Sequence, residues 1–415
     1  MNPRVLAGLL FGVALLAENW PGWRGTDASG ISREAAVPLQ WGKTENVKWR
    51  VTLPEPGNST PVVWGDTVYV TQAEKAIGKR LLLAFERGTG MVRWSAAVPY
   101  GAEPTHPTNP FGSASPVTDG DVVVAWFGSA GVHAFDAKTG KTRWTRDLGI
   151  QKHTWGYGSS PVLHRNFVFL NFGPGERSFV VALDRKTGKT VWQVDVPKGA
   201  GAKFNQWSPE DMYGSWSTPV VHGDELLVTL PRKLVAYELA TGKVLWSSEG
   251  LSDLIYPSPV VAEGMIVAAS GFGGAAMAVK TGGAGDVTAS HRVWHWPKNK
   301  GFIGSGVVKD GHLYWVDIGG IAQCVKLSNG EAMWSARLPR AGEDNGVWGS
   351  PVLHGDHVYV MNKSGNTVVF RAQPGSFEAM GTNVLDEPSN SSVVISGGEI
   401  FLRTHKALWC IRKPS

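Results

Sequence analysis

Charge is scarce in this sequence, and charges of one sign do not gather. Asp, Glu, Lys and Arg make up 18% of the 415 residues, the formal net charge is +5, and the chain has no long run of Lys or Arg. A phosphate-binding stripe needs such a cluster of cations. We therefore expect no nucleic-acid partner.

An apolar stretch of membrane-spanning length is also lacking at the N-terminus. The run from Val5 to Leu16 has about 12 residues, whereas a transmembrane helix needs about 20. Because Arg4 precedes the run and the small residue Ala17 follows it, the pattern is typical of a secretory signal peptide. We predict that residues 1–17 are a cleaved signal peptide, that the protein is periplasmic or secreted, and that the mature chain has no integral membrane segment.

The Ala, Leu, Glu and Lys bias of helical proteins is weak, whereas Gly (52), Pro (25) and Trp (19) are abundant. A chain rich in turn residues and aromatics favours many short strands. Hydrophobic residues make up 42% of the chain, which is enough to bury a large core. We therefore expect an all-β fold.

One short pattern recurs eight times along the chain. It consists of a hydroxyl residue, usually a Pro, and a Val, followed by a turn and an alternating strand such as Asp66 to Val70. This order predicts a β-hairpin, in which the hydroxyl is expected to bond the local backbone. The eight hydroxyl residues are Thr60, Ser115, Ser160, Thr218, Ser258, Ser305, Ser350 and Ser392.

The second half of most units is a strand, a Gly turn and a final strand that ends in Trp. Successive units are about 47 residues apart, the length of one four-stranded propeller blade. We expect each of these large flat side chains to dock between neighbouring sheets. The docking residues are Trp49, Trp94, Trp144, Trp192, Trp246, Trp294 and Trp334.

The eighth unit ends without its Trp strand, and the segment that ends at Trp49 resembles the end of a unit that has no beginning. We predict that residues 47–52 pair with residues 407–412 and so close the ring. The expected architecture is an eight-bladed β-propeller of four-stranded antiparallel blades over residues 46–415, with an N-terminal extension over residues 18–45.

Two units read Ala-x-Asp-x-x-Thr-Gly-Lys-x-x-Trp, at Ala134 to Trp144 and at Ala182 to Trp192. The motif resembles the tryptophan-docking repeat of propellers related to the pyrroloquinoline quinone (PQQ) dehydrogenases. Asn19 to Gly25, Gly173 to Arg177 and Trp216 to Pro219 resemble, more narrowly, a bacterial family of secreted PQQ-binding-like propeller repeat proteins. The resemblance implies the fold and a location outside the cytoplasm, but a fold does not by itself carry a function.

A PQQ dehydrogenase is the enzyme alternative that the resemblance raises. Such enzymes usually have two adjacent cysteines, a calcium site of carboxylate and Asn ligands, and a catalytic Asp; this chain has no adjacent cysteines. Asp317, Glu176 and Asn171 fall in predicted loops, where such residues are common. No Gly-x-Ser-x-Gly motif is present. We assign no catalytic residue, no metal site and no cofactor, with PQQ and calcium as the alternative.

Binding residues are expected at the axis of the ring. The loops that lead into the innermost strands differ from unit to unit, and specificity can reside in such variation on a repeated frame. Aromatic rings beside Arg and Asn can stack on and hydrogen-bond a ligand, or they can simply plug the top of the funnel. The candidate residues are Trp155, Tyr157, Arg177, Trp207, Trp216, Arg232, Tyr256, Trp348 and Asn390.

Two functions are consistent with these features. The first is a non-catalytic extracytoplasmic binding or scaffold module, with a protein, peptide or glycan as partner at the top face. It would be similar in kind to the propeller lipoprotein of the outer-membrane β-barrel assembly machine, although no Cys lies near Ala17 to carry a lipid. The second is a small quinoprotein oxidoreductase of alcohols or sugars.

Cysteine is nearly absent. Cys324 and Cys410 fall in the sixth and eighth units, which do not touch in a ring of eight. A disulfide needs Cα atoms within about 7 Å, so we predict two free thiols.

Overall fold

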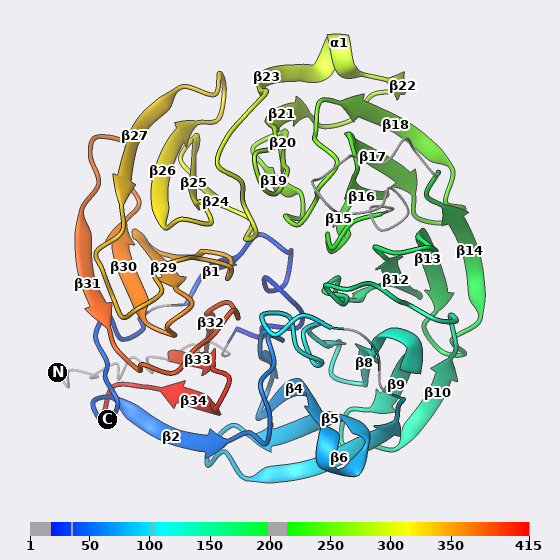
Figure 1. Ribbon diagram of the computed structural model, residues 1–415, viewed down its shortest axis with the longest axis vertical. Helices are drawn as coiled ribbons and strands as arrows, with labels where there is room; N and C mark the ends of the chain where they lie inside the picture. Colours follow the sequence, from blue (N-terminus) through cyan, green and yellow to red (C-terminus); the bar gives the residue numbers. More distant parts are fainter. Residues whose placement is uncertain (1–17, 35, 102, 104, 198–213, 415) are drawn as a thin grey trace, which may run out of the picture.

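The computed structural model describes residues 18–34, 36–101, 103, 105–197 and 214–414. The strands in these residues form eight sheets arranged around a central axis (Figure 1). Within each blade the strands run antiparallel from an innermost to an outermost strand. This confirms the eight-bladed, all-β architecture predicted from the repeat.

The first four blades run in sequence order. Their strands are β3 (Val62–Trp64), β4 (Thr67–Glu74), β5 (Lys79–Glu86) and β6 (Val92–Pro99); β7 (Val117–Thr118), β8 (Val122–Trp126), β9 (Val132–Asp136) and β10 (Thr142–Arg146); β11 (Val162–His164), β12 (Phe167–Phe172), β13 (Phe179–Asp184) and β14 (Thr190–Asp195); and β15 (Val220–His222), β16 (Glu225–Leu230), β17 (Lys233–Glu238) and β18 (Val244–Glu249).

The last four blades follow the same order, except that the eighth takes its outer strand from the N-terminal part of the chain. Their strands are β19 (Val260–Ala262), β20 (Met265–Ala269), β21 (Ala276–Lys280) and β23 (Arg292–Trp296); β24 (Val307–Lys309), β25 (His312–Val316), β26 (Ile321–Lys326) and β27 (Ala332–Arg337); β28 (Val352–His354), β29 (His357–Met361), β30 (Thr367–Arg371) and β31 (Ala379–Asn383); and β32 (Val394–Ser396), β33 (Glu399–Arg403), β34 (Ala407–Ile411) and β2 (Val47–Thr52).

Short elements fill some connections. Two 3₁₀ turns, η1 (Lys75–Ile77) and η2 (Gly128–Ala130), lie in the first and second blades. In the fifth blade β22 (Gly285–Asp286) and helix α1 (Thr288–His291) stand between β21 and β23, and β22 pairs in parallel with β18 of the fourth blade. In the part of the chain that is described, no helix is long and apolar enough to cross a membrane.

The middle strands are buried on both faces because each blade packs against the next. All five residues of β8 are buried, and Val124 and Trp126 share one apolar cluster with Leu170 and Phe172 of the neighbouring blade. The outermost strands, such as β6, alternate between exposed and covered positions because one face meets solvent. The core therefore lies between blades, and the ring holds only if every blade has a neighbour.

The ring closes where the sequence predicted. Strand β2 pairs antiparallel with β34, with Trp49 opposite Cys410, so the eighth blade joins both ends of the chain (Figure 1). The Trp49 indole N–H then donates to the Arg87 carbonyl of the first blade at 2.9 Å. Gly90, with φ +75°, lies so close to this indole that a Cβ atom would approach it within 2.9 Å. Pairing and docking together join the last blade to the first.

Five other Trp residues dock across blade boundaries in the same way. Their indole N–H groups donate to a carbonyl of the next blade, at Ala137 from Trp94, Arg185 from Trp144, Leu239 from Trp192, Leu327 from Trp294 and Gln373 from Trp334. Trp246 differs, because its N–H donates to Glu225 of its own blade at 2.9 Å. The inserted β22 crosses the outer edge of that blade, opposite Trp246.

The repeat hydroxyls do not bond their local backbone, contrary to expectation. Each Oγ accepts the N–H of the corresponding residue in the preceding blade, at 2.8–3.3 Å, and the last bond runs from the Ser392 N–H to Thr60. Eight bonds thus form a closed circle around the axis. A repeat pattern locates a residue within its own blade, whereas this role depends on the contact between blades.

The extension over residues 18–45 crosses one end of the ring as a plug segment, visible in dark blue at the centre of Figure 1. Trp20 pairs with Val63 of the first blade. Strand β1 (Ile31–Ser32) pairs in parallel with β28 of the seventh blade. Trp41 then stacks on Tyr359 of the same blade, with ring centroids 6.3 Å apart.

Candidate functional site: the axial funnel

A cavity of about 150 Å³ lies on the axis. All eight residues that stand three positions before the repeat Pro position line it. They are Asn58, Ser113, Gly158, Trp216, Tyr256, Ile303, Trp348 and Asn390. The eightfold frame therefore brings eight unlike side chains to one place.

The walls of the funnel are aromatic. Trp155, Trp216, Tyr256 and Trp348 line it, and the rings of Trp216 and Tyr256 lie 4.9 Å apart. The Trp216 indole N–H donates to the Gly156 carbonyl at 3.1 Å, which fixes the ring. Trp155 stacks on the His106 imidazole at 3.9 Å between centroids. Burial raises the Tyr256 pKa, so its phenol is neutral.

Trp23 of the plug segment also lines the cavity. The next residue, Arg24, is fully buried and anchors the segment: its guanidinium donates to the carbonyls of Ser305 at 2.7 Å, Gly306 at 2.5 Å and Ser29 at 2.6 Å. Burial lowers the pKa of Arg24 to about 9. The plug segment thus contributes one wall of the cavity and is held against the sixth blade beside it.

Hydroxyl groups form a second layer around the cavity. Seven of the eight circle hydroxyls line it, all except Ser305. Each of the seven accepts a backbone N–H, and none donates its own hydrogen to an acceptor within the described residues. The Ser305 hydroxyl, by contrast, donates to the Ser258 carbonyl at 3.1 Å.

Asparagine amides tie the rim together. The Asn58 and Asn390 side chains both donate to the Thr108 carbonyl, at 3.0 and 2.9 Å. His405 contacts the Asn58 side-chain oxygen at 3.2 Å, and burial, reinforced by the charge of Arg403, lowers the pKa of this His to about 4. The imidazole is therefore neutral at pH 7.

The structure brings some of the predicted site residues together and separates others. Trp155, Trp216, Tyr256, Trp348 and Asn390 line the cavity. Trp207 lies outside the described residues. Trp23 was missed, because the repeat pattern offers no signal for a segment that precedes it.

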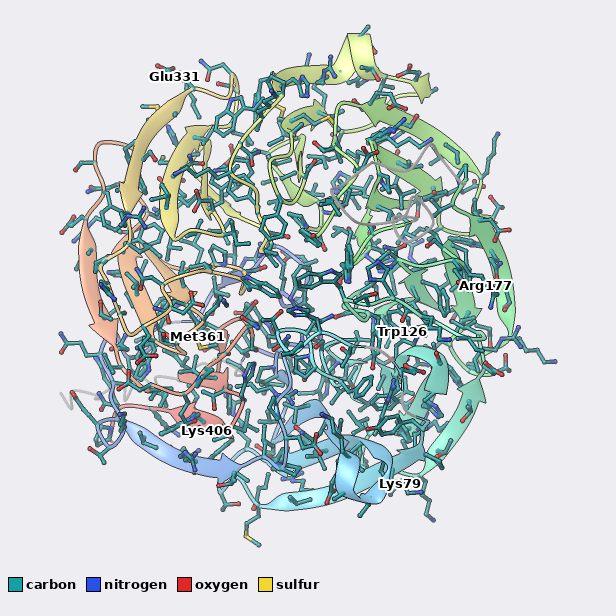
Figure 2. The ribbon with its side chains drawn as sticks, in the orientation of Figure 1. Lys79, Trp126, Arg177, Glu331, Met361 and Lys406 are labelled. Carbon is teal, nitrogen blue, oxygen red and sulfur yellow. The ribbon has the colours of Figure 1, made fainter. Side chains whose placement is uncertain are left out.

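Tyr157 and the two arginines do not line the cavity. Tyr157 is buried behind the wall, with its ring 4.7 Å from Trp126. Arg177 lies towards the rim of the ring in Figure 2 and donates to the Leu148 carbonyl at 3.1 Å. The half-exposed Arg232 pairs with Asp253 at 2.7 Å. Nearness in sequence to a funnel residue did not predict the direction of these side chains.

The comparisons with known proteins agree with this architecture. A family model described as outer membrane protein assembly factor BamB matches residues 39–171 and 176–415. The chain belongs to this family. BamB from Shewanella oneidensis is 28% identical over 135 residues, which are 32% of each chain.

Two enzymes are also among the relatives of this BamB-family chain. Tetrathionate hydrolase from Acidithiobacillus ferrooxidans is 28% identical over 45% of this chain and 37% of its own length. Polyvinylalcohol dehydrogenase from a Pseudomonas species is 24% identical over 57% of this chain and 41% of its own length. The chain spans about a third to two fifths of the length of these curated relatives.

Solved structures share the fold. BamB from Moraxella catarrhalis aligns with a TM-score of 0.63 and 16% identity, over 88% of this chain and 99% of that one. A europium-containing methanol dehydrogenase aligns with a TM-score of 0.72 and 12% identity, over 94% of this chain and 90% of that one. At these identities the likeness concerns the fold alone.

The described lining of this BamB-family funnel does not fit PQQ with calcium. PQQ carries carboxylates, which need cations, and calcium needs several oxygen ligands, mostly carboxylates. Every described lining residue is uncharged, and the described residues hold no group of three or more metal-binding side chains. Asp317 accepts the N–H groups of Gly319 and Ile321 in its own turn, and Asn171 donates to Ser215.

Proposed function

We propose that this chain is a non-catalytic, extracytoplasmic binding propeller that takes one uncharged ring of a ligand into its axial funnel. The main support is a cavity with aromatic walls in which none of the described lining residues is charged. A cavity of about 150 Å³ has the size of engineered cavities that bind benzene, so it admits one ring. The ring can belong to a small molecule, a protein side chain or a glycan.

The location outside the cytoplasm is supported by the BamB relatives and by the signal-like residues 1–17. A further contact supports cleavage after Ala17. The Glu18 N–H donates to the Glu34 carboxylate at 2.8 Å, so an amino terminus created there would meet an opposite charge.

Binding can be tested with phenol, indole and methyl glycosides as ring-shaped probes, measured by titration calorimetry. Trp216→Ala and Trp348→Ala should each weaken the binding of an active probe about 5- to 150-fold, which corresponds to about 1–3 kcal/mol of stacking energy. Trp64→Ala, a half-buried Trp at the end of β3 outside the funnel, is the matched control.

Three outcomes contradict the proposal. The first is that no ring-shaped probe binds the wild-type protein. The second is that affinity is unchanged in both funnel variants while circular dichroism shows an intact fold. The third is that the protein binds PQQ with calcium, seen in its absorption spectrum, and oxidises alcohols in a dye-linked assay, which would establish the quinoprotein alternative.

A further inference from the structure

If the funnel binds an uncharged ring, as proposed above, its polar groups determine which kind of uncharged ring it accepts. The circle hydroxyls use their oxygen atoms to accept backbone N–H groups, as in Ser160 from Ser115 at 3.0 Å. Their remaining capacity is the O–H hydrogen. Seven of these hydroxyls line the cavity, and none of the seven donates its hydrogen to an acceptor among the described residues.

Each Asn amide at the rim already donates to a backbone carbonyl. The Asn109 side chain donates to the Trp155 and Tyr157 carbonyls at 2.6 and 3.0 Å, and Asn58 and Asn390 donate to Thr108. The side-chain oxygen of Asn390 is buried and has no partner among the described residues. The funnel therefore has many hydroxyl donors and at least one open amide acceptor.

These groups exclude two ligand classes. A charged group would lose its hydration without meeting a counter-charge, which is costly in a closed site. A purely apolar ring would stack on the tryptophans but leave the hydroxyl hydrogens and the Asn390 oxygen dry and unbonded, which costs free energy for each group. The ligand must have apolar faces and also both accept and donate hydrogen bonds around its edge.

A pyranose ring meets these requirements. Its C–H faces stack on aromatic rings, and its hydroxyls both donate and accept. We infer that the funnel binds the terminal pyranose ring of a neutral sugar or glycan. The terminal position follows from the plug segment, because Trp23 lines the cavity and Arg24 holds the segment to the sixth blade, where it would obstruct a chain of sugars passing along the axis.

Calorimetric titration of the full chain with the methyl glycosides of glucose, galactose, mannose and N-acetylglucosamine tests this inference, with phenol and tetramethylammonium as non-sugar probes. We expect at least one glycoside to bind and neither non-sugar probe to compete at equal concentration. Trp348→Ala should weaken glycoside binding about 5- to 150-fold. A deoxy form of the active glycoside should bind about 10-fold more weakly, because a buried polar group loses its partner.

The results separate this inference from the proposed function. Binding of phenol without any glycoside would overturn the sugar inference and keep the uncharged-ring site. Glycoside binding that is unchanged in both Trp216→Ala and Trp348→Ala would place the sugar elsewhere and overturn the inference. Failure of every probe to bind would overturn both.

Discussion

We predict that Arg24 makes a large contribution to the stability with which the plug segment docks on the ring. Its guanidinium donates to the carbonyls of Ala28, Ser29, Ser305 and Gly306 at 2.5–3.1 Å, two of them in the plug and two in the sixth blade. Hydrogen bonds from a charged donor contribute about 1.5–3 kcal/mol each. Burying the cation costs several kcal/mol, since desolvation is the largest influence on its pKa. Removal of the side chain would recover that cost but leave four carbonyls without this donor, at about 1–3 kcal/mol each.

The replacement Arg24→Met keeps the length of the side chain and removes every donor. We expect docking of residues 18–34 to weaken by about 2–4 kcal/mol, which is about 30- to 1,000-fold in the exchange protection of their amides. The blades should keep their protection, because β2 and β34 close the ring independently of the plug.

Hydrogen exchange measured by mass spectrometry reports the protection of the amides in residues 18–34 directly. The control is Arg33→Met in the same segment, where the side chain is 62% exposed and pairs with Asp27, so its loss should change protection by less than about 1 kcal/mol. Continued protection of residues 18–34 in Arg24→Met, or equal exposure of them in Arg33→Met, would contradict the anchoring role of Arg24.

The pKa of His405 in the folded protein, about 4, lies below the unfolded value of about 6.5. The free energy of unfolding should therefore be highest above pH 6.5 and fall towards pH 4, with a loss of about 1–2 kcal/mol at pH 5. The melting temperature of His405→Gln should depend less on pH than that of a His222→Gln control. Trp49→Ala should cost about 3–5 kcal/mol in urea unfolding, and a loss below about 1 kcal/mol would refute a role for this docking contact in ring closure. Thiol titration of the denatured, unreduced protein should find both Cys324 and Cys410 free, and neither should react rapidly in the native state, where burial raises their pKa values. Intact mass of the exported protein should place the N-terminus at Glu18, and any other first residue would contradict cleavage after Ala17.

The sequence predicted what the repeat encodes and little beyond it. The blade count, the pairing of β2 with β34 and the meeting of Trp216, Tyr256 and Trp348 at the axis all follow from positions within one unit. The role of Arg24 does not, because its partner Ser305 lies 281 residues away and the segment matches no unit. Arg177 was misplaced because a loop's sequence does not fix the direction of its side chains.

The two layers of the funnel differ in how much their residues vary. The circle hydroxyls are all Ser or Thr, and each bonds the same backbone atom of its neighbour, so changing one weakens the ring. The residues two positions before them include Asn, Gly, Ile, Trp and Tyr, a variety that closure of the ring does not require. Because unlike side chains on a uniform frame can change without loss of the frame, this upper layer would set which ring fits the proposed site, and the circle hydroxyls below it would supply hydrogen-bond donors. A chain with the same hydroxyl circle and different residues above it would keep the propeller and bind another ligand.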